Sequence, residues 1–149
     1  MEEETKEAKP NRHIFLWVLG IISAIANALI IVINVLLLFG TPAINFVLKI
    51  PVLDTLTEEE LHGNAFYFLI RIIIHGFVIY TLNIILRLKR RGFFYYLGAQ
   101  IALLILPFIF LTSLGIPYLL ISFGVSSIFS FFFIMLFSLY IPKMTNSKE

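Results

Sequence analysis

Four long apolar stretches, separated by shorter polar segments, make up most of the 149-residue chain. A helix needs about 20 residues to cross the roughly 30 Å hydrocarbon core of a bilayer, and each stretch is about that long or longer. The pattern therefore predicts an all-α fold, an integral membrane four-helix bundle formed by one membrane domain. The predicted spans are residues 14–39, 64–86, 93–111 and 118–141.

Composition supports the same class. Hydrophobic residues make up 60% of the chain and charged residues 13%, whereas soluble domains are about half apolar and about a quarter charged. So few charges cannot cover a soluble surface. The chain has no cysteine, which excludes disulfides, thiolate metal sites and thiol redox chemistry. The formal net charge of +2 comes mainly from residues that flank the apolar stretches, so it predicts contacts with the lipid bilayer and anionic headgroups, and no nucleic-acid partner.

The polar segments are expected at the membrane surface. Residues 1–13 and 142–149 form two polar tails. Between the first and second spans, an apolar run is interrupted by Lys49 and Pro51, so it is too broken to cross. We expect this connection to be an interfacial external segment. Thr57 and Glu60 within it have the spacing of a capping box, which predicts that the second helix begins near Glu58.

The distribution of lysine and arginine predicts how the protein lies in the membrane. Arg87, Lys89, Arg90 and Arg91 separate the second and third spans, whereas the first connection contains only Lys49. Positively charged flanks are retained in the cytoplasm. The sequence therefore predicts both termini in the cytoplasm and two external connections. We also expect the four hairpin residues to contact anionic lipid headgroups at the inner interface.

Two ionisable side chains lie within the second span. Arg71 and His75 are four residues apart, so they project from one face of the helix. An arginine at the centre of the bilayer costs at least about 2.5–3.5 kcal/mol, which favours a bundle-facing position, a water-filled cleft or a side chain that reaches the headgroups. One interpretation is structural, with His75 bonded to a neighbouring helix. The others are a cleft for an anionic headgroup, a fatty acid or a small anion, and contact with a partner.

Amide side chains recur within the spans. Asn27 and Asn34 share one face of the first helix, because seven residues make about two turns. Such groups usually join helices through hydrogen bonds of about 0.6–2 kcal/mol, or they line a polar cleft together with Arg71 and His75. Both interpretations stay open. The amides concerned are Asn27, Asn34, Asn83 and Gln100.

Small residues and missing acids complete the pattern. Ser122, Ser126 and Ser130 recur every four residues beside Gly124, which predicts close helix packing. No Asp or Glu lies in any predicted span, which disfavours a proton-coupled carrier, since such proteins usually need a membrane carboxylate.

The sequence offers no constellation of catalytic or metal-ligating residues, and no second imidazole at the depth of His75 for a haem. We therefore expect no catalytic residue, metal or cofactor.

The segment LRLKRRGFFYYLGAQIALLILPFIF, residues 86–110, resembles a pattern of uncharacterised small four-span bacterial inner-membrane proteins. In that pattern a short basic loop is followed by glycine, aromatic residues and a polar residue that opens the third span. The resemblance covers about the middle third of the chain. It implies a bacterial inner membrane and four spans, and it implies no activity. The residues that carry it are Lys89, Arg91, Gly92, Phe93, Tyr96 and Gln100.

These patterns lead to two functional hypotheses. The first is a non-enzymatic multi-pass membrane protein that scaffolds or assists a membrane partner protein, or forms a homo-oligomer, with a lipid or anion cleft near Arg71 and His75. It predicts a closed, well-packed interior. The alternative is a subunit of a small oligomeric transporter or channel, which predicts a continuous polar groove. An enzyme is the least favoured class, because no second ionisable group is expected beside His75. The polar groove of the transporter or channel hypothesis would join Asn27, Asn34, Arg71, His75 and Gln100.

Overall fold

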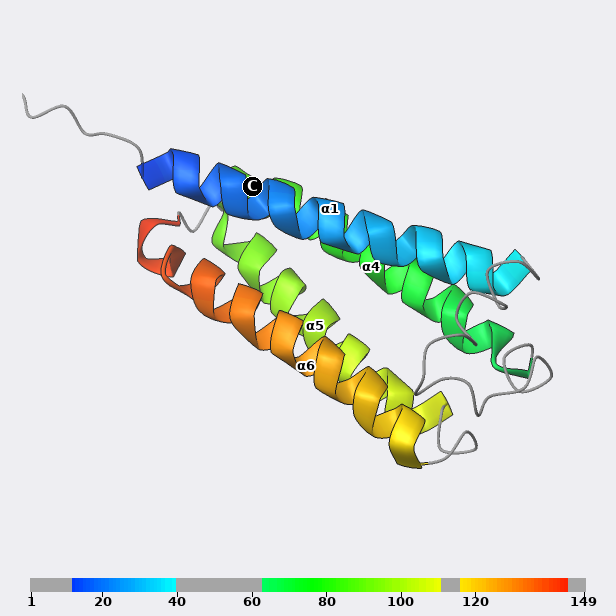
Figure 1. The fold of residues 1–149 in the computed structure, drawn as a ribbon. Helices are drawn as coiled ribbons and strands as arrows, with labels where there is room; N and C mark the ends of the chain where they lie inside the picture. The colour runs from blue at the N-terminus through cyan, green and yellow to red at the C-terminus, as the bar shows by residue number, and fades with distance from the viewer. Residues whose placement is uncertain (1–11, 40–62, 111–115, 145–149) are drawn as a thin grey trace, which may run out of the picture.

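The structure is a computed structural model in which residues 12–39, 63–110 and 116–144 are described (Figure 1). Four helices in this part of the chain are long and apolar enough to cross a membrane. The prediction of an all-helical fold with four such helices is therefore confirmed. The helices are α1 (Arg12–Phe39), α4 (Ala65–Leu86), α5 (Arg90–Phe110) and α6 (Ile116–Ser138), and the short 3-10 helix η2 (Ile141–Lys143) follows them.

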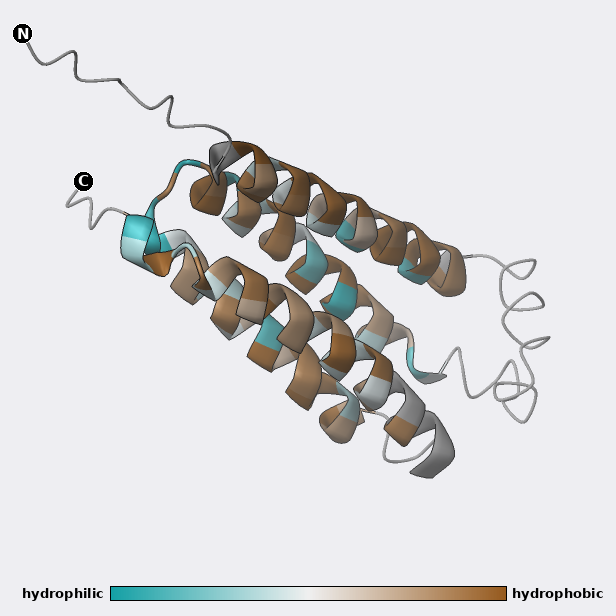
Figure 2. Cartoon of the chain, turned by 60° about the vertical axis from the view of Figure 1, so that its left-hand side comes forward, coloured by the Kyte–Doolittle hydropathy of each residue, from teal (hydrophilic) through white to brown (hydrophobic). Residues whose placement is uncertain are grey.

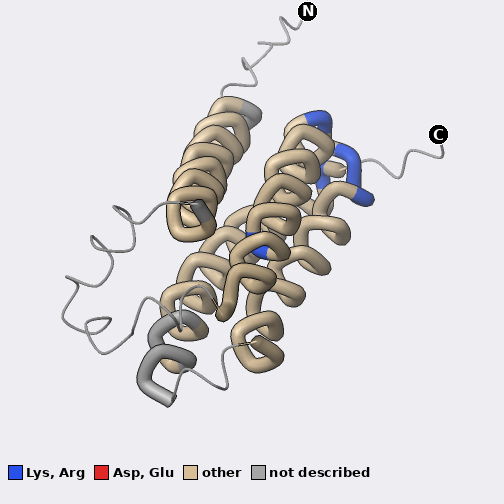
Figure 3. Tube along the Cα trace, turned by 90° about the vertical axis from the view of Figure 1, so that its right-hand side faces the viewer, with Lys and Arg blue, Asp and Glu red and all other residues tan. Residues whose placement is uncertain are grey.

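The helices lie side by side in chain order. Helix α1 packs against α4, α4 against α5, and α5 against α6. The start of α1, the α4–α5 hairpin and the end of α6 therefore meet at one end of the bundle (Figure 1). Lysine and arginine gather there (Figure 3), so we call it the basic end. Among the residues whose side chains are described, the cationic ones at this end are Arg87, Lys89, Arg90, Arg91 and Lys143.

Hydrophobic residues make up most of each helix (Figure 2), and many of them are exposed on its outer face. Ile73, Ile109 and Ile128 are 63%, 63% and 72% exposed. The interior is also largely apolar near the basic end, where the rings of Tyr96 and Phe137 meet edge to face with centroids 5.2 Å apart. A helix that is apolar both inside and outside is typical of a membrane span rather than of a water-soluble bundle.

A tight hairpin joins α4 to α5. Leu88 has a φ of 55° and donates its N–H to the Ile85 carbonyl at 2.8 Å, which reverses the chain within a few residues. The reversal brings Gly92 so close to α4 that an added Cβ would lie 2.8 Å from the Ile85 nitrogen. Because the turn is so short, α5 begins at Arg90, earlier than the Phe93 expected for the third span.

The last predicted span, residues 118–141, overlaps helix α6 and the 3-10 helix η2 that follows it. Helix α6 ends at Ser138, and the chain continues through η2, which includes Pro142. The tails at 1–11 and 145–149, the interfacial segment at 40–62 and its capping box lie outside the described residues.

Candidate functional site

One polar side chain faces inward from near the middle of each long helix. All four are at least 94% buried, with exposed fractions of 4–6%. Buried polar groups in such surroundings require hydrogen-bond partners, because an unsatisfied group costs several kcal/mol in hydrocarbon. We call these residues the polar layer: Asn27 in α1, His75 in α4, Gln100 in α5 and Ser130 in α6.

The polar layer forms two hydrogen-bonded pairs. Asn27 Oδ1 lies 2.7 Å from His75 Nδ1 and joins α1 to α4. Ser130 Oγ donates to Gln100 Oε1 at 2.6 Å and joins α6 to α5. Each pair links neighbouring helices, and neither links the two halves of the bundle to each other.

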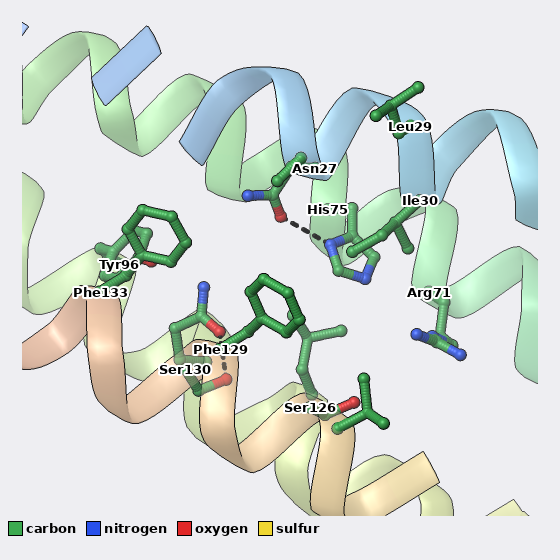
Figure 4. Close-up of a pocket in the computed structure, with 14 residues that line it drawn as sticks. Asn27, Leu29, Ile30, Arg71, His75, Tyr96, Ser126, Phe129, Ser130 and Phe133 are labelled. Carbon is green, nitrogen blue, oxygen red and sulfur yellow. Dashed lines mark hydrogen bonds between the residues drawn. The ribbon is translucent and has the colours of Figure 1, made fainter. Parts of the chain in front are cut away.

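A cavity of about 350 Å³ lies between the two pairs (Figure 4). All four residues of the polar layer line it, together with Arg71, Tyr96 and apolar side chains that include Leu103 and Phe133. Its volume is near the lower limit of about 300–1,000 Å³ for ligand pockets. The combination of apolar walls with a few convergent polar groups is typical of a ligand site.

Arg71 supplies the positive charge of the cavity. Its Nη1 donates to the Tyr67 hydroxyl at 3.2 Å, and its Cζ lies 5.4 Å from the centroid of the Tyr67 ring. A guanidinium has five N–H donors. The described residues contain no Asp or Glu, so within this part of the chain no carboxylate can pair with Arg71.

The cavity reaches the outer surface between α1 and α6. Leu29, Val125 and Phe129 line it, yet they are 58%, 53% and 55% exposed. Nearer the basic end, the Phe15 and Tyr140 rings stack with centroids 6.3 Å apart, which brings α1 and the end of α6 into contact. We call the opening between Leu29 and the two α6 residues the lateral mouth.

Two buried polar atoms of the lining have unmet hydrogen-bonding capacity. His75 Nε2 has no hydrogen-bond partner in the described part of the chain. The Tyr96 hydroxyl is near the Ser23 and Gln100 side chains but forms no hydrogen bond of acceptable geometry with either. A ligand in the cavity therefore finds polar atoms that the protein itself does not satisfy.

The structure separates the predicted cleft residues into two groups. It brings Asn27, Arg71, His75 and Gln100 together around the cavity. Asn34 is buried on the same face of α1, but its Nδ2 donates to the Ile30 carbonyl at 2.6 Å and it does not line the cavity. The step of seven positions from Asn27 to Asn34 displaces it by roughly 10 Å along the helix axis.

Asn83 does not belong to the site. It is exposed on α4, because the eight residues after His75 rotate it by about 80° away from the cavity face. Of the five residues expected to line a transporter groove, four line this cavity and Asn34 does not.

The four residues predicted to contact anionic headgroups lie together at the basic end. Arg87, Arg90 and Arg91 are exposed and Lys89 is half-buried. Arg90 Cζ lies 5.7 Å from the centroid of the Phe94 ring. Arg90 and Arg91 occupy the first turn of α5, where the helix dipole disfavours positive charge by about 0.3–1 kcal/mol each. Anionic headgroups around this turn would offset that cost.

Sequence reasoning missed part of the lining. The serine ladder of α6 predicted close packing, but Ser126 and Ser130 line the cavity, and the side chain of Ser122 lies outside the described residues. Tyr96 was not among the predicted cleft residues, but it also lines the cavity. The position along the helix could have identified Ser130, because Gln100 and Ser130 both lie near the middle of their helices and so at a similar depth in the predicted spans.

Comparisons with known proteins provide no relative: no family model, no curated protein and no solved structure matches the chain. The function is therefore inferred from the cavity, the charges and the apolar surface.

Proposed function

We propose that this chain is an integral membrane protein that crosses the bilayer four times and binds an anionic amphiphile or small organic anion in its central cavity. The apolar outer faces and the four helices of spanning length support the membrane location. Such a binding role suits an accessory or self-associating membrane protein, and it requires no reaction.

The proposed orientation places the basic end and both termini in the cytoplasm. The cationic residues gathered at that end support it, since lysine and arginine near span ends are retained inside. The resemblance of residues 86–110 makes a bacterial inner membrane the proposed location. In this orientation the α4 terminus at Ala65 faces the exterior, and Arg71 lies about 9 Å inside that end of the helix.

The observation that carries the proposal is the position of Arg71. This cation lines a cavity, has one neutral hydrogen-bond partner, and no described residue can supply a carboxylate. A charge removed from water is costly unless it is paired. An anionic group in the cavity would supply the missing partner.

Binding is favoured over a conducting path. Toward the basic end the cavity is lined by Tyr96, whose ring packs edge to face on Phe137. A cavity that meets packed aromatic rings at that end and opens at a lateral mouth supports a binding site within the bundle.

Native mass spectrometry of the protein in mild detergent tests this function. We expect the wild type to retain an anionic lipid, fatty acid or small anion, and Arg71→Ala to lose it. Arg87→Ala is the matched control, because it removes an exposed arginine at the basic end and should retain the ligand. Identical ligand-free spectra for all three proteins would contradict the proposal.

A further inference from the structure

The Asn27 amide determines which nitrogen of His75 carries hydrogen. Asn27 Nδ2 donates to the Ser23 carbonyl at 2.7 Å, so its Oδ1 is the atom that faces His75 Nδ1 at 2.7 Å. An amide oxygen can only accept, and Nδ1 must therefore donate. In the neutral ring with hydrogen on Nδ1, Nε2 is a bare acceptor.

This acceptor is buried and faces the cavity. His75 is only 5% exposed, lines the cavity, and its Nε2 has no partner among the described residues. In Figure 4 the second ring nitrogen points away from Asn27, on the side of Arg71. Residues four apart on a helix have Cβ atoms about 5–6 Å apart, so one small group can contact both.

The two side chains make opposite demands on a ligand. Arg71 offers only donors, whereas His75 Nε2 only accepts. A halide or a fully deprotonated anion has no hydrogen to give to Nε2. An ester has an acceptor for Arg71, but it likewise has no hydrogen to donate to Nε2. A carboxylic acid meets both demands: one oxygen accepts from Arg71, and the hydrogen on the other oxygen moves to Nε2, which leaves the carboxyl group with the negative charge that pairs with Arg71.

The shape of the cavity indicates what the acid carries. Its lining extends along α6 from Val125 to Phe133, about 12 Å of helix, and becomes aromatic toward the basic end. A volume of about 350 Å³ is more than twice the roughly 150 Å³ of an apolar cavity that accepts benzene. It suits one alkyl chain better than the two chains of a phospholipid.

The lateral mouth indicates where the ligand comes from. Leu29, Val125 and Phe129 present apolar side chains at the opening between α1 and α6. With its head at Arg71 and its chain toward Phe133, the ligand has the same direction as an amphiphile in the outer leaflet. It can therefore enter sideways from the bilayer without turning over.

We infer that the cavity binds a single-chain carboxylic acid, held between Arg71 and His75 Nε2 by its carboxyl group, which enters from the bilayer through the lateral mouth. The inference rests on the proposed function and specifies the ligand class of the same site. Its only chemical step is the shift of the acid hydrogen from the carboxyl oxygen to Nε2 within their hydrogen bond.

The first test compares an acid with its ester. The full chain is placed in phosphatidylcholine nanodiscs, and binding of radiolabelled dodecanoic acid and methyl dodecanoate is measured after subtraction of empty nanodiscs. We expect the acid to bind at least about tenfold more tightly, since one buried acceptor is left unsatisfied by the ester. In His75→Phe the preference should fall to about twofold or less. The wild-type comparison stands alone if this variant does not fold.

The second test addresses the route. Leu29→Trp and Val125→Trp narrow the lateral mouth and should slow the uptake of dodecanoic acid about tenfold or more. Ile25→Trp and Ile128→Trp are matched controls, because these residues are 56% and 72% exposed on the same two helices and do not line the cavity. The controls should take up the acid at the wild-type rate.

The outcomes separate this inference from the proposed function. Equal binding of acid and ester in the wild type would overturn the carboxylic-acid assignment, and the comparison of wild type with Arg71→Ala in native mass spectrometry would then decide alone whether the cavity binds an anion. Binding of inorganic phosphate without either chain-bearing probe would also overturn the carboxylic-acid assignment, but anion binding at Arg71 would stand. Unchanged uptake in both mouth variants would overturn the lateral route. If no probe binds and Arg71→Ala changes nothing, both proposals fail.

Discussion

Asn27 and His75 are 48 residues apart in the chain, yet Asn27 Oδ1 lies 2.7 Å from His75 Nδ1 in the middle of the bundle. The bond joins α1 to α4 and also leaves Nε2 of the same ring facing the cavity. One contact therefore serves both the packing of the helices and the chemistry of the site. Its structural part can be tested separately from ligand binding.

Replacing Asn27 with leucine should destabilise the protein by about 1–2 kcal/mol, because it removes an interhelical hydrogen bond and leaves His75 Nδ1 without a partner. The free energy of unfolding in mild detergent, measured by titration with sodium dodecyl sulfate, is the observable. Asn34→Leu is the control, since the amide of Asn34 bonds only to its own helix.

A double-mutant cycle with His75→Leu sharpens this test. If the two side chains stabilise the protein through each other, the double variant should lose less stability than the sum of the single variants. Additive losses would contradict the bond between Asn27 and His75 as the source of the effect.

The Ser130 and Gln100 pair makes a parallel prediction for the other half of the bundle. Ser130→Ala removes the donor to Gln100 Oε1 and should lower the free energy of unfolding by about 1 kcal/mol. Ser138→Ala provides the comparison, because Ser138 Oγ donates only to the Met135 carbonyl of its own helix. Equal effects of the two substitutions in the same detergent titration would argue against a stabilising interhelical pair.

The close approach of the two helices at Gly92 leads to a prediction about the α4–α5 hairpin. An added Cβ would lie 2.8 Å from the Ile85 nitrogen and 2.9 Å from the Ile84 Cβ, so Gly92→Ala should force α4 and α5 apart and cost about 1–3 kcal/mol. Gly98→Ala, in the same helix, meets nothing within 4 Å and should stabilise by about 0.5–1 kcal/mol. Thermal unfolding of the two variants checks the opposite signs, and a neutral Gly92→Ala would contradict the close approach.

The four-helix architecture could be predicted because it depends on one coarse quantity, the length of apolar stretches against the thickness of a bilayer. The helix ends were less predictable. The start of α5 at Arg90 depends on Leu88 with its positive φ, and hydropathy carries no information about a single backbone angle.

The site was predictable only in part, for a geometric reason. Arg71 and His75 stand out because ionisable residues are rare in a span, and Asn27 lies at the matching depth. Asn83 could have been separated from His75 on the sequence alone, because the eight residues after His75 rotate it by about 80° around the helix. The contributions of Ser126 and Ser130 required knowledge that a cavity, and not a packed interface, lies beside α6.

The orientation in the membrane leads to the last prediction. The chain has no cysteine, so one cysteine added at the carboxyl terminus is the only thiol that an impermeant reagent can label. In intact cells of a bacterial host this thiol should be protected, and it should become reactive after lysis, because the proposed orientation places the basic end in the cytoplasm.

Replacing Arg87, Lys89, Arg90 and Arg91 together with glutamine should produce a mixture of orientations, seen as partial labelling before lysis. Lys49→Gln is the control, since it removes a positive charge from the connection expected outside and should leave the thiol fully protected. Complete labelling of the unmodified chain in intact cells would overturn the orientation. Arg71 would then lie nearer the cytoplasmic surface, and the acid would have to arrive from the inner leaflet.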